Sequence, residues 1–299
     1  MQGPIRIYKE QQLDLSHLIP CILNAYLSYI ATILNIVGIY AIRKTSSLSK
    51  NFKTLLLSLA VSDLGVGLLA QPMHVTRLVM DSTQKNETIE SHNAIHIAYL
   101  IPLNLFTFSS LFSVTALCAD RFLAIHLHLS YQELVTYKRV AAVIFSIWAF
   151  SALISLIRLW VPKNIMYVIF ATIESACMVA AISLSVKLYL TLRRHINQIQ
   201  VPPVAQNNQG DSVQRKRKSA MASLFVWLVF IVCYLPNIFN LFITAAISEP
   251  SIYVQQLQIY TLTLEFLNST LNPLIYCWKM KQIRDTVIGK LRDVFSRHT

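Results

Sequence analysis

The chain has 299 residues, of which 55% are apolar and 13% are charged, and its formal net charge is +12. An ordinary soluble domain carries about 25% charged residues, so water is not the solvent for most of this chain. These proportions exclude a cytosolic enzyme, a secreted domain and a disordered tail.

Seven segments are nearly free of charge, and each can cross a bilayer because a spanning helix needs roughly 20 apolar residues. We predict spans over residues 15–42, 54–80, 91–119, 140–160, 164–192, 219–248 and 250–278. The spans leave no room for a separate soluble domain, so residues 1–299 form one all-α domain, a seven-transmembrane-helix bundle. Apolar residues recur every four positions after the last span, which predicts a short amphipathic cytoplasmic helix over 279–296.

The distribution of charge predicts the orientation of the bundle. With the N-terminus outside the cell, and with the Lys and Arg residues near the span ends counted with the side that they adjoin, the cytoplasmic segments hold 20 Lys and Arg residues against five acids, whereas the outer segments hold six of each. This asymmetry follows the positive-inside rule. The basic segments are expected to face anionic membrane lipids and cytosolic partners, and no nucleic acid. Asn86-Glu87-Thr88 in the first outer loop is a glycosylation sequon, which predicts a glycan on Asn86.

A lone acid inside a span is a functional candidate because an unpaired charge in the bilayer costs several kcal/mol. Asp63 is such an acid, and polar side chains recur in other spans at Asn35, Ser110, Asn268, Ser269 and Asn272. A carboxylate surrounded by amides and hydroxyls suits a small hard cation. A hydrogen-bonded cluster without an ion explains the same residues, and the pattern leaves both interpretations open.

Three further features lie at the end of the third span and inside the last two spans. Asp120-Arg121-Phe122 ends the third span, where the acid can hold the arginine, although an arginine at a helix end also snorkels to lipid headgroups. Pro236 and Pro273 lie inside the last two spans, where each removes a backbone hydrogen bond and is expected to kink its helix.

Taken in order, these motifs make the chain similar to rhodopsin-like (class A) G-protein-coupled receptors over essentially its whole length. Each motif alone is common, but their joint order in seven spans is specific. The matching residues are Asn35, Leu59-Ala60 with Asp63, Asp120-Arg121-Phe122, Trp148, Phe230 with Cys233-Tyr234-Leu235-Pro236, and Asn272-Pro273-Leu274-Ile275-Tyr276.

The resemblance implies a plasma-membrane receptor, not an enzyme, that binds an extracellular small-molecule, lipid or peptide ligand and promotes nucleotide exchange on a heterotrimeric G protein. It implies no cofactor other than an allosteric sodium ion. The implied sodium ligands are Asp63, Ser110, Asn268 and Asn272. The implied coupling and switch residues are Asp120, Arg121, Phe230, Tyr234, Pro236, Pro273 and Tyr276.

The resemblance also implies a ligand pocket near the outer ends of the helices. The candidates are His74, Leu103, Asn104, Thr107, Glu174, Tyr234, Leu262 and Glu265. Leu103 stands where aminergic receptors carry an aspartate, and residues 250–278 contain no lysine for a retinal Schiff base. Two interpretations of Glu265 remain open. It binds a cationic or hydrogen-bonding ligand, or it is protonated or paired with a donor inside the protein. For Glu174, the alternative to ligand binding is an ion pair with Arg158 or Lys163.

Departures from the family pattern indicate a subgroup within the family. His96 replaces a cysteine at the outer end of the third span, the second outer loop is very short, and the fifth span has no proline. These features resemble the subgroup of melanocortin, cannabinoid and lysophospholipid receptors. Basic residues around Lys216 stand where an acid often restrains the arginine that matches Arg121. We therefore predict appreciable basal activity.

Two other classes of protein explain part of the pattern. A small transporter or channel would use Asp63, Glu174 and Glu265 to line an ion path. It would not explain the ordered motifs, and the sequence shows no inverted repeat. A membrane scaffold that keeps the receptor fold without signalling is the second alternative, and the intact Asp120-Arg121 and Asn272-Pro273 pairs argue against it.

Overall fold

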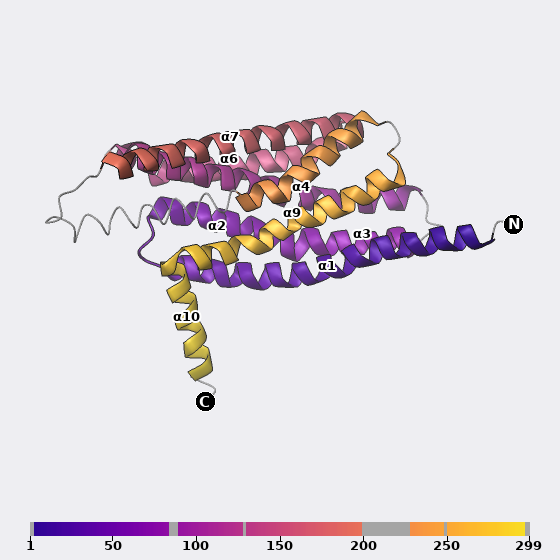
Figure 1. Ribbon diagram of the computed structural model, residues 1–299, viewed down its shortest axis with the longest axis horizontal. Coiled ribbons are helices and arrows are strands. Elements are labelled where there is room, and N and C mark those ends of the chain that lie inside the picture. The colour runs from indigo at the N-terminus through magenta and orange to yellow at the C-terminus, as the bar shows by residue number, and fades with distance from the viewer. Residues whose placement is uncertain (1–2, 84–88, 128–129, 199–227, 248–249, 297–299) are drawn as a thin grey trace.

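A computed structural model describes residues 3–83, 89–127, 130–198, 228–247 and 250–296, and these ranges are almost entirely helical. The long helices lie side by side along a common axis and form one bundle (Figure 1). The first turns of α1 lie at one end of the bundle, and the helix α10 turns away from the other end. This architecture confirms the predicted all-α bundle.

The helices have the following bounds in chain order. They are α1 (Gly3–Lys44), α2 (Lys50–Gly65), η1 (Val66–Ala70), α3 (Gln71–Thr83), α4 (Ile89–His126), α5 (Tyr131–Leu134), α6 (Tyr137–Leu156), η2 (Ile157–Leu159), α7 (Lys163–Gln198), a helix over Leu228–Ala246, α9 (Ile252–Lys279) and α10 (Lys281–Ser296). Six of these helical stretches, with α2, η1 and α3 counted together, are long and apolar enough to cross a membrane. The seventh span is α9, which is 28 residues long but carries more polar side chains.

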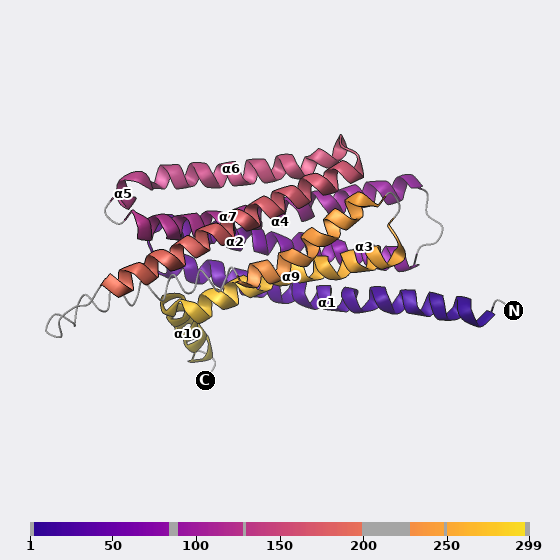
Figure 2. The same ribbon diagram turned by 45° about the horizontal axis from the view of Figure 1, so that its top comes forward.

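The helix α4 occupies the middle of the bundle. It packs against α2, α6 and α7, while α1 packs against α2, α3 and α9 (Figure 2). Large apolar side chains such as Phe145, Leu153 and Phe239 point outward, whereas Asn35 and Asp63 are completely buried. This arrangement suits a lipid solvent, because the polar groups find partners only inside the protein.

The amphipathic helix that the sequence predicts after the last span is present as α10. Ile283 is buried against the bundle, and the hydroxyl of Thr286 lies 3.1 Å from that of Thr45 at the end of α1. The neighbouring charged residues Arg284 and Asp285 are exposed. The helix is therefore anchored by its first turns next to the Lys44 end of α1.

Several helices differ from the predicted spans, and α4 and α7 continue to His126 and Gln198, beyond the predicted ends at residues 119 and 192. The helix α1 begins at Gly3 instead of residue 15, and Pro4 is compatible with that start because a proline in the first helical turn removes no helical hydrogen bond. The second span is interrupted by one π-helical turn, η1. That turn exposes the Gly67 carbonyl oxygen, which accepts a hydrogen bond of 2.7 Å from the Ser28 hydroxyl of α1.

Candidate functional site

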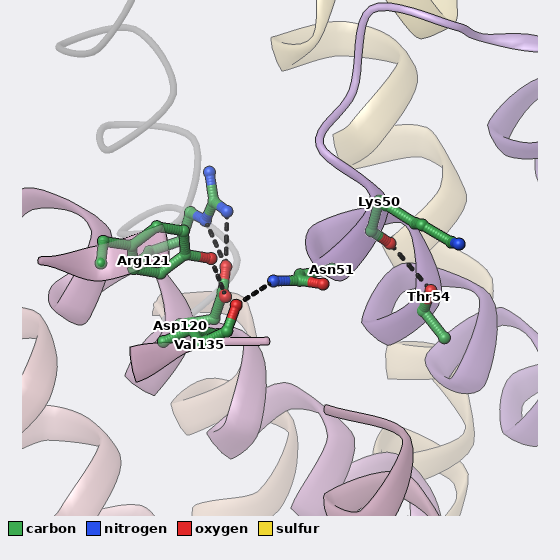
Figure 3. Close-up of polar contacts among 7 residues, drawn as sticks. Lys50, Asn51, Thr54, Asp120, Arg121 and Val135 are labelled. Carbon is green, nitrogen blue, oxygen red and sulfur yellow. Dashed lines mark hydrogen bonds and ion pairs between the residues drawn. The ribbon is translucent and has the colours of Figure 1, made fainter. Parts of the chain in front are cut away.

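The end of the bundle at which α10 lies holds Arg121 in a compact cluster. Its Nε donates a 3.0 Å hydrogen bond to Asp120 Oδ2, and its Nη2 contacts the same oxygen (Figure 3). The guanidinium carbon lies 3.8 Å from the centre of the Phe52 ring of α2. Arg121 is thus fixed both by an acid on its own helix and by an aromatic ring on the neighbouring helix.

Tyr131 of α5 completes the cluster by donating a 2.6 Å hydrogen bond to Asp120 Oδ1. Burial raises the pKa of Tyr131, so the phenol keeps its proton and remains a donor. The amide of Asn51 donates to the Val135 carbonyl oxygen, which ties the start of α2 to the segment after α5 (Figure 3). The sequence indicated Asp120 and Arg121 but not Phe52 or Tyr131, because neither belongs to a motif that reveals their proximity to Arg121.

The middle of the bundle contains the predicted cation ligands. Asp63 accepts a 3.0 Å hydrogen bond from the Ser110 hydroxyl and a 2.8 Å hydrogen bond from the Asn272 amide. Ser269 also interacts with this carboxylate, and Asn35 Nδ2 donates to the Ser269 carbonyl oxygen at 3.0 Å. The structure therefore brings α1, α2, α4 and α9 together around one acid.

The chemistry of this cluster fits a small cation. Both polar atoms of the Asn268 side chain are buried without a hydrogen-bond partner among the described residues, as is Asn272 Oδ1. A carboxylate with hydroxyl and amide oxygens around it is the set of ligands that hard cations prefer. The residues that would hold the ion are Asp63, Ser110, Asn268 and Asn272.

Two aromatic residues lie between this cluster and the half of the bundle farther from α10, which we call the outer half. Phe230 and Tyr234 stack with their ring centroids 4.1 Å apart, and both are almost fully buried. They share the helix Leu228–Ala246 with Pro236. The structure thus places these three predicted switch residues on one element beneath the outer cavity.

The outer half of the bundle contains a cavity of about 660 Å³. Seven of the predicted pocket residues line it: His74, Leu103, Asn104, Thr107, Glu174, Leu262 and Glu265. Tyr234, the eighth predicted pocket residue, is not among the residues that line it. Asn237, about one helical turn farther along the same helix, lines the cavity instead.

Each glutamate of the cavity has a partner that the sequence did not indicate. Asn237 Nδ2 donates a 2.9 Å hydrogen bond to Glu265 Oε2, and Glu174 and Glu265 are close enough to interact electrostatically. Glu174 is only 3% exposed. Among the described residues, Glu174 forms no ion pair with Lys163. The reason is that Glu174 lies deep in the bundle instead of at its outer surface.

One side of the cavity is aromatic. The Tyr99 hydroxyl lies 2.8 Å from His74 Nδ1, and the two rings stack with centroids 5.4 Å apart. The edge of Phe266 contacts the same imidazole, at 5.5 Å between ring centroids. His74 was predicted from the sequence, but Tyr99 was not, because a tyrosine in an apolar segment is more often part of a core. The predicted glycosylation site, Asn86, lies outside the described residues.

The comparison with known proteins agrees with this geometry. Residues 34–276 match the family of the 7 transmembrane receptor (rhodopsin family). The adenosine receptor A2a of Canis lupus familiaris is 25% identical over 292 residues, which cover 87% of this chain and 69% of the relative. The melanocortin receptor 5 of Homo sapiens is 28% identical over 272 residues, which cover 87% of this chain and 80% of the relative. The adenosine receptor A2b of Gallus gallus is 25% identical over 299 residues, which cover 86% of this chain and 84% of the relative.

These matches confirm the family that the ordered motifs indicated. The melanocortin receptor agrees with the predicted subgroup, whereas the sequence motifs did not suggest the adenosine receptors. The family is a class of receptors and not of enzymes, and it does not favour the transporter or channel alternative. The chain is a multi-pass membrane protein and belongs to the rhodopsin family of G-protein-coupled receptors.

Proposed function

We propose that this receptor lies in the plasma membrane with its N-terminus outside the cell, and that a small-molecule, lipid or peptide ligand binds in the outer cavity. Ligand binding would then promote nucleotide exchange on a heterotrimeric G protein at the Arg121 end. The observation that carries the proposal is the placement of the cavity and the Arg121 cluster at opposite ends of one bundle. His17, Asp81, Lys163 and Ile252 mark the cavity end, and Phe52 and Tyr131 mark the other.

The proposed orientation rests on charge. The helix α10 and the turn between α1 and α2 lie at the same end of the bundle as Arg121. The helix α10 is basic, and the turn is flanked by Arg43, Lys44, Lys50 and Lys53. Anionic lipids are concentrated in the cytoplasmic leaflet, so this end is expected to face the cytosol. The cavity then opens to the extracellular side.

The proposed mechanism is a change in the population of two arrangements of the bundle. The Arg121 side chain contacts Asp120 and Phe52 in this structure. It has to break at least one of these contacts before it can bind a G protein. A ligand that binds better to the arrangement in which Arg121 is free shifts the population towards it. Phe230 and Tyr234 are positioned to transmit such a change, because they lie beside Pro236 between the cavity and the cytoplasmic half.

A sodium ion would oppose this change. The ion would be held by Asp63, Ser110, Asn268 and Asn272. Because these residues belong to α2, α4 and α9, a bound cation would stabilise the arrangement in which the three helices are packed together. The support is the buried Asn268 side chain, whose polar atoms have no partner in the described part of the chain.

The decisive experiment is guanine-nucleotide exchange in membranes that contain the receptor and one G-protein class at a time. We expect exchange with at least one class, and we expect Arg121→Ala to abolish it at an equal surface level. Arg43→Ala is the matched control, because Arg43 is an exposed arginine at the same end of the bundle. Equal exchange in the wild type and in Arg121→Ala would contradict the assigned role of Arg121, and no exchange with any class would contradict the proposal as a whole.

A further inference from the structure

The deep wall of the outer cavity carries two acids from two helices. Glu174 comes from α7 and Glu265 from α9, and each is 3% exposed. Both line the cavity, and their carboxyl groups interact electrostatically with each other. Two carboxyl groups in one apolar environment repel when both are ionised, so this wall favours any group that brings positive charge.

Neutral donors satisfy only part of this pair. Asn237 Nδ2 donates to Glu265 Oε2 at 2.9 Å and also interacts with Glu174, and Thr107 interacts with Glu265. Glu174 Oε2 and Glu265 Oε1 are both buried without a hydrogen-bond partner among the described residues. Because a buried acceptor without a donor costs about 1–3 kcal/mol, the two free oxygens indicate a missing donor.

The cationic side chains that line the cavity do not supply this donor. Arg77 Nε lies 3.3 Å from Asp81 Oδ2, and its guanidinium faces the Tyr99 ring at 5.4 Å from the centroid. Lys163 begins α7, eleven residues before Glu174, which places the two Cα atoms about 16 Å apart along the helix. A four-carbon side chain does not span that distance.

The rest of the cavity suits an organic molecule. Its volume of about 660 Å³ lies within the range of small-molecule pockets, about 300–1,000 Å³, and far exceeds the space that a single ion fills. Tyr99, Phe108 and Phe170 line it and offer aromatic faces to an apolar body or a cation. His74 Nε2 and Asn104 Nδ2 are further buried polar atoms without a partner in the described part of the cavity wall.

We propose that the cavity binds a small organic cation, with a protonated amine or amidine between Glu174 and Glu265 and its apolar body against the aromatic wall. The inference rests on the proposal that this cavity is the ligand site of the receptor. An ammonium or amidinium group has several N–H donors, so it would satisfy both free carboxylate oxygens at once and neutralise the pair.

The test uses the full-length receptor purified in detergent, without a G protein, and follows its thermal unfolding midpoint. The probes are benzamidine and 4-phenylbutylamine, and the matched neutral compounds are benzamide and 4-phenylbutanol. At ten times the half-saturating concentration, each cationic probe should raise the midpoint by roughly 3 °C, and the neutral compounds should not.

Variants of the two acids, together with one control variant, test whether the acids bind the probes. The double variant Glu174→Gln, Glu265→Gln should lose the rise, while the control Glu133→Gln, an exposed glutamate of α5, should keep it. If the double variant does not fold, the single variants Glu174→Gln and Glu265→Gln provide the test. Each keeps one carboxylate and should need about tenfold more probe for the same rise.

Three results would overturn the inference: no rise with either cationic probe, an equal rise with the neutral compounds, or a rise that survives loss of both acids. If neither probe shifts the wild type and the double variant unfolds at a higher temperature than the wild type, the acids are a pair that shares a proton, and the inference is overturned. The outcome is independent of signalling. A receptor that binds amines without nucleotide exchange contradicts only the proposed function, and one that signals without responding to amines contradicts only this inference.

Discussion

Arg121 is held by two kinds of contact, and the sequence indicated only one of them. Its neighbour Asp120 was evident from the motif, but the Phe52 ring beneath the guanidinium was not, because Phe52 lies on another helix and in no motif. The basic cluster around Lys216, from which we predicted appreciable basal activity, lies outside the described residues. The prediction therefore stands, and basal exchange above that of vector-transfected cells at verified surface expression is its test.

The contact with Phe52 gives a second prediction at the scale of a residue. Phe52→Leu keeps an apolar side chain but removes the ring face, and a cation–π contact contributes about 0.5–1 kcal/mol at an accessible site. If this contact holds Arg121 away from the G protein, basal nucleotide exchange should rise about two- to fivefold. Phe52→Tyr should restore the wild-type level, and Phe145→Leu, at a side chain that is 76% exposed to lipid, serves as the control. Unchanged exchange in Phe52→Leu would show that Asp120 alone restrains Arg121.

Asp63 allows a direct test of the cation site. Asp63→Asn removes the charge but preserves the shape of the side chain that contacts Ser110 and Asn272. Replacing choline chloride by sodium chloride at constant ionic strength should raise the thermal unfolding midpoint of the wild type by a few degrees, and this rise should be absent in Asp63→Asn. The control is Asp285→Asn, an exposed acid of α10. Equal effects of sodium on all three proteins would show that the ion acts elsewhere.

At the scale of an element, the sequence predicted the helices well and their irregularities poorly. Apolar length alone indicates the spans, since each helix has to satisfy its own backbone inside the membrane. The π-helical turn η1 was not predicted, although Pro72 follows it and a proline inside a helix removes a backbone hydrogen bond. Two other helices approach this part of the second span closely. A side chain on Gly65 would collide with the Phe106 ring of α4, and one on Gly67 would meet Thr32 of α1.

The turn η1 gives a prediction for helix packing. A Cβ atom at residue 67 would lie 2.9 Å from Thr32 Oγ1 and 3.0 Å from the Thr32 backbone nitrogen, so α1 or η1 has to shift. Gly67→Ala should therefore destabilise the bundle by about 1–3 kcal/mol, the usual cost of overpacking. Gly38→Ala is the control, because its Cβ would meet only Pro273 Cβ at 3.7 Å, an ordinary contact. The measurement is the thermal unfolding midpoint of each purified variant, and equal midpoints would show that η1 adapts freely.

At the scale of the whole molecule, the three polar centres occupy different depths of one bundle. Phe52 and Asp63 lie on the same helix, eleven residues or about 16 Å apart, so an ion at Asp63 cannot touch a protein bound at Arg121. Glu265 and Asn272 are two helical turns apart on α9, which separates the cavity from the cation site in the same way. Sequence motifs identified members of each centre, but their relative depth follows only from the packing of α2, α4 and α9 around one axis. Any effect of one centre on another has to pass through the arrangement of the helices.

This separation predicts a reciprocal coupling between sodium and the G protein. If both ligands act on one equilibrium of the bundle, saturating sodium should weaken binding of the nucleotide-free G protein by the same factor by which that G protein weakens sodium binding. A coupling of about 1–3 kcal/mol corresponds to a factor of about 5–150 in each direction. The first factor is measured from G-protein binding to the purified receptor in sodium chloride and in choline chloride. The second comes from sodium titrations of the same receptor with and without the G protein. Asp63→Asn should reduce both factors to one, whereas Asp285→Asn should leave both unchanged. Two unequal factors in the wild type would mean that sodium also binds at a second place, and a sodium effect that persists in Asp63→Asn would assign it to an ion bound away from Asp63.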